Sequence, residues 1–212
     1  MSRRIEVGQR ITRKNDEIAA EFRERFQRAG VKVSSLVSAP GSGKTAWLAR
    51  TLSELKSRGR RAAALVGDLE SDCDARRLAE SGLPVQQIET HGICHLEAYM
   101  LEDCLRAWNL NEMDHLFLEN VGNLVCPLGF DLGESLRVLM ISTPEGEDKP
   151  LKYPQAVAWA DLILVTKMDL AAAVDFDEQA LRDNIQRAKP NVPILFCSAR
   201  SGQGMDEWLK LV

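Results

Sequence analysis

The chain has 212 residues and a formal net charge of −4, with 45% hydrophobic and 27% charged residues. This length suits one α/β domain with an N-terminal extension. The acidic balance argues against nucleic acid or an anionic membrane as the main partner, and no apolar run approaches the ~20 residues of a membrane-spanning helix. The start lacks the apolar core of a secretory signal, and the five cysteines are not spaced like a disulfide scaffold. We therefore expect a cytoplasmic protein with reduced thiols.

The order of the predicted elements indicates an α/β fold. Residues 1–30 are expected to form an N-terminal amphipathic helix or extension, with Phe22 and Phe26 at helical spacing, which either packs on the domain edge or binds a partner. Residues 31–212 are expected to form the main domain. Strands are predicted at 31–37, 61–66, 85–89, 115–119, 135–142, 162–166 and 193–197, and helices at 44–58, 71–80, 95–106, 154–160, 177–189 and the C-terminal end. This alternation predicts a mostly parallel sheet flanked by helices on both faces.

The most informative segment is a glycine-rich turn between a strand and a helix, Ser38-Ala39-Pro40-Gly41-Ser42-Gly43-Lys44-Thr45. It has the pattern of a phosphate-binding P-loop, in which the backbone N–H groups of Gly41, Ser42 and Gly43 surround phosphate oxygens. Lys44 would supply positive charge for binding and catalysis, and the Thr45 hydroxyl would ligate Mg²⁺. A serine stands at position 38, where the general motif has glycine. Because strand, turn and helix agree, a P-loop NTPase is favoured over a chance turn.

Two later strand ends predict that the bound base is guanine. Thr166, Lys167 and Asp169 form a T-K-x-D pattern after a buried strand. The Asp169 carboxylate can accept hydrogen bonds from N1–H and the exocyclic amine of guanine, a donor pair that adenine lacks. The Lys167 stem can lie along the base, and a backbone N–H at Ser198 or Ala199 can meet guanine O6. GTP and GDP are therefore the expected nucleotides.

Acidic residues near the phosphates predict a magnesium site. Asp68 closes the second predicted strand, and Glu119 closes the fourth. Both are candidates to bind Mg²⁺ directly or through water and to act in catalysis. Gly122 completes an E-x-x-G turn whose backbone N–H is the expected sensor of a γ-phosphate. Asp72 or Asp74 is a candidate to orient the attacking water, the alternative being solvated acids after a strand.

These motifs and several others resemble one family, the HypB GTPases that insert nickel into hydrogenases. The matching residues are Ser38 to Thr45, Gly67-Asp68, Asp74-Ala75-Arg76-Arg77, Gly92-Ile93-Cys94-His95-Leu96, Glu119 to Pro127, Glu145 to Pro154, Asn15-Asp16, Arg23 and Phe26. The resemblance thus spans nearly the whole chain. It implies a slow, Mg²⁺-dependent GTPase, a GTP-dependent homodimer, and a small nickel metallochaperone as partner within the hydrogenase maturation machinery.

The resemblance also implies a Ni²⁺ or Zn²⁺ site formed by Cys94, His95 and Cys126. From spacing alone, packing is the commoner role of an adjacent Cys-His pair. Thiolate and imidazole ligands suit either metal. Three ligands leave an incomplete coordination shell, so a site shared across a dimer is chemically sensible. Since Cys126 follows the turn at Glu119 to Gly122, one loop would couple the phosphate state to metal affinity.

We therefore expect a GTP-hydrolysing metallochaperone for [NiFe]-hydrogenase maturation. One rival is a GTPase with a structural zinc at a dimer seam, and another is an accessory GTPase for a different nickel enzyme. A small-molecule kinase would use adenine and leaves the T-K-x-D pattern unexplained. The chain has no cysteine before Cys73 and no histidine-rich stretch, so nickel storage is not expected.

Overall fold

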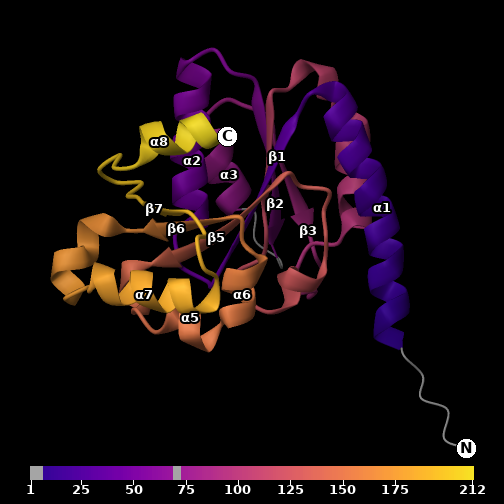
Figure 1. Cartoon of the computed structure of the whole chain (residues 1–212). Coiled ribbons are helices and arrows are strands. Elements are labelled where there is room, and N and C mark those ends of the chain that lie inside the picture. Colours follow the sequence, from indigo (N-terminus) through magenta and orange to yellow (C-terminus); the bar gives the residue numbers. More distant parts are fainter. Residues whose placement is uncertain (1–6, 69–72) are drawn as a thin grey trace, which may run out of the picture.

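The structure is a computed structural model that describes residues 7–68 and 73–212, with side chains described from residue 12 onward (Figure 1). Within this part of the chain, seven parallel strands form one sheet in the order β3-β2-β4-β1-β5-β6-β7. The strands are β1 (Lys32–Ser38), β2 (Ala62–Asp68), β3 (Val85–Glu89), β4 (His115–Glu119), β5 (Leu136–Ser142), β6 (Leu162–Thr166) and β7 (Ile194–Phe196). Strand β1 lies between β4 and β5. The residues that follow the carboxyl ends of these three parallel strands therefore lie close together at one edge of the sheet.

Helices connect the strands and cover both faces of the sheet. The α-helices are α1 (Val7–Ala29), α2 (Lys44–Ser57), α3 (Cys73–Ala79), α4 (Glu102–Ala107), α5 (Lys149–Lys152), α6 (Pro154–Trp159), α7 (Glu178–Ala188) and α8 (Met205–Leu211). Short 3₁₀ segments are η1 (Ala98–Leu101), η2 (Leu110–Glu112), η3 (Cys126–Gly129), η4 (Thr143–Glu145) and η5 (Met168–Val174). None of the described helices combines the length and the apolar character needed to cross a lipid bilayer.

The two faces of the sheet bury different helices because successive side chains of a strand point in opposite directions. Ala62 and Ala64 of β2 belong to a core shared with α2, α3 and α8, whereas Ala63 belongs to a core shared with α1 and α4. On the first face, the Trp47 and Trp208 rings lie 6.3 Å apart. On the second face, α6 and α7 bury apolar residues against β5 and β6. The predicted parallel sheet with helices on both faces is confirmed.

The N-terminal helix α1 runs along one side of the molecule (Figure 1). Its residues Phe22 and Phe26 are 3% and 2% exposed and pack with β1, β4 and the η1–α4 segment. Their rings lie 6.1 Å apart, as the helical spacing of the two phenylalanines predicts. Helix α1 is therefore part of the packed core on this face.

The predicted helix over residues 95–106 is wrong at its start. Glu97 is extended, with φ −116° and ψ 151°, and helical structure begins only at Ala98. The backbone N–H groups of Leu96 and Ala98 donate to asparagine side chains from other parts of the chain. These tertiary hydrogen bonds hold the segment around His95 as a loop, although its apolar spacing is typical of a helix.

Candidate nucleotide and metal site

The glycine-rich turn connects β1 to α2 and is already shaped like a phosphate cradle. Gly41 and Gly43 have φ values of 76° and 95°, a conformation that favours glycine. The Lys44 ammonium donates to Ser38 Oγ over 2.9 Å, so the serine at the variant position of the motif positions the lysine. Burial lowers the pKa of Lys44, and the nearby Glu119 carboxylate opposes that effect. A buried cation at the first turn of a helix is suited to phosphate oxygens.

A cavity of about 480 Å³ lies over this turn. Its walls are residues 40–46 except Ser42, the end of β2 at Gly67 and Asp68, the turn 119–122, and the side chains of Asp74 and Arg77. The structure therefore brings together Lys44, Thr45, Asp68, Glu119 and Gly122, as the sequence predicts. Asp72 lies outside the described residues.

Glu119 is the most unusual acid in this cavity. Its side chain is buried, and Oε1 accepts a hydrogen bond of 2.7 Å from Thr45 Oγ1. Oε2 is buried without a hydrogen-bond partner among the described residues. Burial raises the pKa of Glu119 to about 7, because the charged form is poorly solvated. A divalent cation with oxygen ligands fits here, since it would compensate the carboxylate charge beside the Thr45 hydroxyl.

The turn that follows Glu119 packs tightly against the phosphate loop. A Cβ atom at Gly122 would lie 3.0 Å from the Cα atom of Pro40, so a side chain at this position would push the two segments apart. This contact explains why glycine is needed in the E-x-x-G turn. The phosphate loop and the turn at residues 119–122 are thus in direct contact at Pro40 and Gly122.

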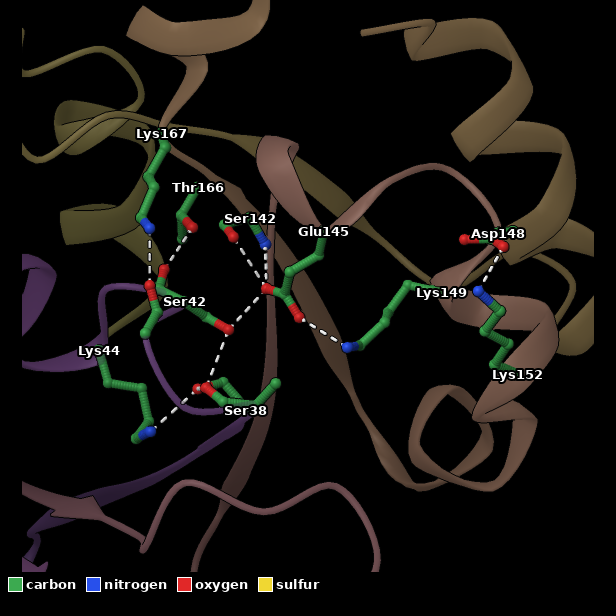
Figure 2. Close-up of polar contacts among 12 residues, drawn as sticks. Ser38, Ser42, Lys44, Ser142, Glu145, Asp148, Lys149, Lys152, Thr166 and Lys167 are labelled. Atoms are coloured by element: carbon green, nitrogen blue, oxygen red, sulfur yellow. Dashed lines mark hydrogen bonds and ion pairs between the residues drawn. The ribbon is translucent and has the colours of Figure 1, made fainter. Parts of the chain in front are cut away.

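The T-K-x-D residues border an adjoining cavity of about 430 Å³. Thr166 Oγ1 donates to the Ser42 carbonyl over 2.6 Å, and Lys167 Nζ donates to the Gly41 carbonyl over 2.6 Å (Figure 2). Asp169 Oδ1 accepts from Ser198 Oγ over 2.6 Å, which orients the carboxylate. This cavity shares Gly43, Ala46 and Arg77 with the phosphate cavity. The two cavities therefore lie next to each other, and together they are called the nucleotide groove.

The structure separates the roles of Ser198 and Ala199. The Ser198 backbone N–H donates to the Gln203 carbonyl, and its hydroxyl donates to Asp169. Ala199 itself borders the cavity, and its carbonyl accepts from Arg50 Nη1 over 2.8 Å. Of the two predicted residues, Ala199 is thus the better placed to offer a backbone N–H to a base, whereas Ser198 orients the carboxylate.

A half-buried carboxylate, Glu145, connects the phosphate loop to the end of β5 (Figure 2). Its Oε2 accepts from Ser42 Oγ over 2.6 Å and from the Ser142 backbone N–H over 2.8 Å, while Lys149 Nζ lies 3.1 Å from Oε1. Burial opposes the negative charge, but the hydrogen bonds from Ser42, Ser142 and Lys149 hold the pKa of Glu145 below its ordinary value. The ionised carboxylate therefore holds Ser42 of the phosphate loop against Ser142 at the end of β5.

Cys94 and His95 lie on the loop after β3, and Cys126 lies on the loop segment after β4, where η3 begins. These three residues are hereafter called the metal trio. One candidate ligand atom from each residue lies within 4.8 Å of the others, and Cys94 Sγ is 3.9 Å from His95 Nδ1. A hydrogen bond with Cys126, together with burial, raises the pKa of the Cys94 thiol. Two sulfurs and an imidazole nitrogen at this spacing fit Ni²⁺ or Zn²⁺, and binding would displace thiol protons.

The imidazole of His95 is oriented by its neighbours. Glu97 Oε1 lies 3.3 Å from His95 Nε2, whereas Cys94 Sγ lies near the other ring nitrogen, Nδ1. The Phe130 ring stacks on the imidazole at a centroid distance of 4.0 Å. The carboxylate near Nε2 and the ring against the imidazole face leave Nδ1 facing the Cys94 sulfur. A carboxylate near the distal nitrogen is common at metal-binding histidines, although Nε2 makes no hydrogen bond among the described residues.

Asn123 links the two loops that carry the metal trio. Its Oδ1 accepts from the Cys126 backbone N–H over 3.3 Å, and its Nδ2 donates to the Cys94 carbonyl over 3.4 Å. The side chain therefore spans the gap between the two cysteines. These bonds bring residues from two distant parts of the sequence into one site.

Asn120 links the phosphate turn to the same loop. Its Oδ1 accepts from the Val121 backbone N–H over 2.9 Å and from the Leu96 backbone N–H over 3.0 Å. The residue is 2% exposed, so these bonds are shielded from water. Asn120 thus connects the turn after Glu119 to the residue that follows His95.

Several site residues were not identified from the sequence. Arg77 borders both the phosphate cavity and the base cavity, although the sequence marks it only as part of the resemblance. Asn120, Asn123 and Glu145 likewise lie within recognised stretches to which the sequence assigns no separate role. The sequence offered one signal for two of these residues, because Asn120 directly follows Glu119 and Asn123 directly follows Gly122 in the E-x-x-G turn.

Comparison with known proteins places this site in context. A family model described as CobW/HypB/UreG, nucleotide-binding domain, matches residues 32–196. The chain is 48% identical over 208 residues to hydrogenase maturation factor HypB of Azotobacter vinelandii, covering 98% of this chain and 68% of the relative. It is 36% identical over 208 residues to hydrogenase/urease maturation factor HypB of Helicobacter pylori, covering 96% and 85%. A crystal structure of HypB from Helicobacter pylori in complex with nickel is similar, with a TM-score of 0.86, 37% identity and 93% coverage of both chains.

Proposed function

This chain belongs to the HypB family of hydrogenase maturation factors, and we propose that it is a GTP-hydrolysing metallochaperone that assists nickel delivery to a [NiFe]-hydrogenase. The observation that carries the proposal is Asn120, whose amide oxygen holds both the phosphate turn and the loop of the metal trio. This contact joins the nucleotide groove to the loop of the metal trio, which supports a function that uses both. A protein that only stored metal would not need the nucleotide groove.

Guanine selection is supported by the geometry of the base cavity. Asp169 is held by Ser198 and borders a cavity that opens onto the phosphate loop. In the proposed complex, the carboxylate accepts two N–H groups from guanine, and Lys167 lies along the base. Adenine presents an acceptor in place of one of these donors, which leaves the carboxylate unmatched.

Hydrolysis is proposed to rely on charge neutralisation around the γ-phosphate. Lys44 supplies positive charge, the Gly122 N–H contacts the γ-phosphate, and Arg77 adds a second cation at the cavity wall. Thr45 and Glu119, with Asp68, would hold Mg²⁺, which neutralises phosphate charge when bound. Asp72 and Asp74 remain the candidates to orient the attacking water. A slow rate is expected, as in other GTPases that act as switches.

Nickel is proposed as the cargo of the metal trio. The nickel complex of the similar Helicobacter pylori protein supports this metal over zinc, although the donor set suits both. Three donors leave a coordination position for a ligand from a second molecule. We propose that a GTP-dependent homodimer completes the shell in the cytoplasm, and that a small nickel metallochaperone exchanges metal with it.

Coupling between the two sites is proposed to run through two contacts. One is the hydrogen bond from Leu96 to Asn120. The other is a packing contact, because a Cβ at Gly67 would lie 2.7 Å from the Leu96 side chain, and Gly67 borders the phosphate cavity. Rearrangement around the γ-phosphate would therefore shift the segment that carries Cys94 and His95, which changes nickel affinity.

The test is Ni²⁺ affinity by chelator competition in the GDP state and with a non-hydrolysable GTP analogue, with light scattering to follow dimerisation. We expect affinities that differ by about 5–150-fold, the usual range of coupling between two sites. Cys126→Ala should weaken Ni²⁺ binding by more than about 100-fold, because loss of an outer residue alone costs 10–100-fold. GDP affinity should stay within about 2-fold.

Cys73→Ser is the matched control, since this exposed thiol on α3 lies outside the metal trio. It should leave Ni²⁺ affinity unchanged. Equal Ni²⁺ affinities in the two nucleotide states would indicate that the metal has only a structural role. Unchanged Ni²⁺ affinity in Cys126→Ala would show that the metal trio is not the nickel site.

A further inference from the structure

We propose that Asn15 on helix α1 is a positioning residue for the metal trio, and that α1 fixes the spacing of the two metal-bearing loops. The inference rests on the proposed metal function and adds a third element to that site. The N-terminal helix would thus influence metal affinity, although it contributes no metal ligand and does not line the nucleotide groove.

The Asn15 amide bridges both loops at once. Its Nδ2 donates to the Asp131 carbonyl over 2.8 Å, and its Oδ1 accepts from the Ala98 backbone N–H over 2.7 Å. The side chain is 4% exposed, although polar residues on a surface helix usually face water. One buried amide therefore joins two backbone segments that are distant in the sequence, and both bonds are shielded from solvent.

Each end of this bridge lies next to a group that orients His95. Ala98 follows Glu97, whose carboxylate lies 3.3 Å from His95 Nε2. Asp131 follows Phe130, whose ring stacks on the imidazole at 4.0 Å. A shift at either end would therefore rotate or translate the imidazole relative to Cys94 and Cys126. Groups that orient a metal ligand in this way usually affect metal affinity strongly.

Helix α1 is anchored firmly enough to serve as the fixed reference. Arg23 donates to both carboxylate oxygens of Asp131 at 2.6 Å. Gly133 packs against the helix so closely that an added Cβ would lie 2.8 Å from the Ala19 carbonyl oxygen. The loop after Cys126 is thus attached to α1 at Asp131 and again at Gly133, and Asn15 extends this attachment to the other loop.

The residue type fits the task. An asparagine amide offers a donor and an acceptor from one short side chain, and both are needed here. Aspartate at this position keeps the acceptor for the Ala98 N–H, but it cannot donate to the Asp131 carbonyl and would place two oxygens against each other. Alanine removes both bonds. The two substitutions therefore release one loop or both.

The experiment measures Ni²⁺ affinity of the full chain by chelator competition, together with the nickel–thiolate absorption spectrum. We expect Asn15→Ala to weaken Ni²⁺ binding by roughly 10–100-fold and Asn15→Asp by roughly 10-fold. The charge-transfer bands should change because the imidazole moves relative to the sulfurs. GDP affinity should remain within about 2-fold, since Asn15 lies outside the nucleotide groove.

Phe26→Leu is the matched control for stability. It weakens the packing of the same helix but leaves the Asn15 amide intact, so it should lower the melting temperature without changing Ni²⁺ affinity or the spectrum. If both Asn15 variants bind Ni²⁺ like the parent with the same spectrum, the residue only anchors the helix and the proposal is overturned. Absence of Ni²⁺ binding by the unmodified chain would instead overturn the proposed function on which this inference rests.

Discussion

The nucleotide groove and the metal trio lie side by side but are built in opposite ways. The groove is formed by contiguous motifs at strand ends, with backbone conformations fixed by glycines such as Gly41 and Gly43. The metal trio is formed by side chains on two loops that are joined by asparagine amides. Apart from the turn at residues 119–122, we expect the packed backbone of the groove to be the more rigid of the two, whereas a site held by a few hydrogen bonds can be shifted by small changes. In the proposed coupling, we therefore expect the nucleotide state to change the geometry and the metal affinity of the metal trio.

The largest expected effect is on the rigid side of this comparison. Asp169→Asn should weaken GDP binding on the order of 1,000-fold, because a carboxylate that accepts two N–H groups is replaced by an amide that presents a donor to one of them. Fluorescent GDP titration measures the loss. Ni²⁺ affinity of the nucleotide-free protein should be unchanged.

Xanthosine diphosphate offers a rescue of Asp169→Asn, because it carries a carbonyl where guanine has its amine. That carbonyl can accept a hydrogen bond from the side-chain amide that the substitution introduces. Asp175→Asn, at an exposed position in the same loop, is the control and should bind GDP normally. Equal loss for both diphosphates would mean that Asp169 supports the fold and does not read the base.

A second prediction concerns the opposite end of the sheet, which carries neither site. His115 at the start of β4 is 1% exposed, and its Nε2 lies 2.7 Å from Arg60 Nη2. Burial, followed by the positive charges of Arg60 and Lys32, lowers the pKa of His115 from 6.5 to about 4. As pH falls through this window, the unfolded chain takes up the proton first. The free energy of unfolding should therefore drop by about 3 kcal/mol between these values.

Denaturant unfolding at a series of pH values measures this slope. His115→Gln keeps an acceptor for Arg60 and should remove the contribution of this group, which flattens the profile. His91→Asn, at an exposed histidine with a left-handed backbone, should leave the profile as it is. An unchanged slope in His115→Gln would assign the acid sensitivity to other groups.

The smallest effect is expected at the support behind the phosphate loop. Glu145→Ala should weaken GDP binding by about 10-fold, because it leaves the Ser142 N–H without this acceptor and removes the bond that ties Ser42 to the end of β5, so that the Ser42 hydroxyl keeps only the Ala39 carbonyl. The same titration and the melting temperature measure this loss. Asp148→Ala removes a nearby exposed ion pair to Lys152, visible in Figure 2, and should change affinity by less than about 2-fold. Equal effects of the two variants would show that Glu145 is dispensable for the loop.

The fold and the nucleotide groove could be predicted because their signals are local. The turn from Ser38 to Thr45 and the T-K-x-D pattern after β6 each carry their chemistry in adjacent residues. The strand–helix alternation then places them at one edge of a parallel sheet. Hydrophobic spacing predicted a helix from residue 95, but residues 95–97 form a loop. Hydrogen bonds to the side chains of Asn120 and Asn15 hold this loop in place.

The residues that support the metal trio and the phosphate loop could not be predicted, because they contact residues that are distant in the sequence. Asn15 acts on residues that lie 83 and 116 positions away. Glu145 acts on Ser42 across 103 positions. Such roles depend on the folded arrangement of loops, and neither periodicity nor spacing carries that information. The metal trio itself was suggested by the family resemblance, because an adjacent Cys-His pair alone does not distinguish ligation from packing.

The most direct measurement of the central claim is the ratio of Ni²⁺ affinities between the GTP-analogue and GDP states in the unmodified chain and in Asn120→Ala. We predict a ratio of about 5–150-fold in the unmodified chain, and a clearly smaller ratio in the variant, in which only the packing contact between Gly67 and Leu96 remains. Linkage also requires Ni²⁺ to change the analogue-to-GDP affinity ratio by the same factor. Asn120→Asp keeps the acceptor for the Leu96 N–H and should retain the coupling. A ratio that persists undiminished in Asn120→Ala would contradict the claim that this amide connects the phosphate turn to the metal trio.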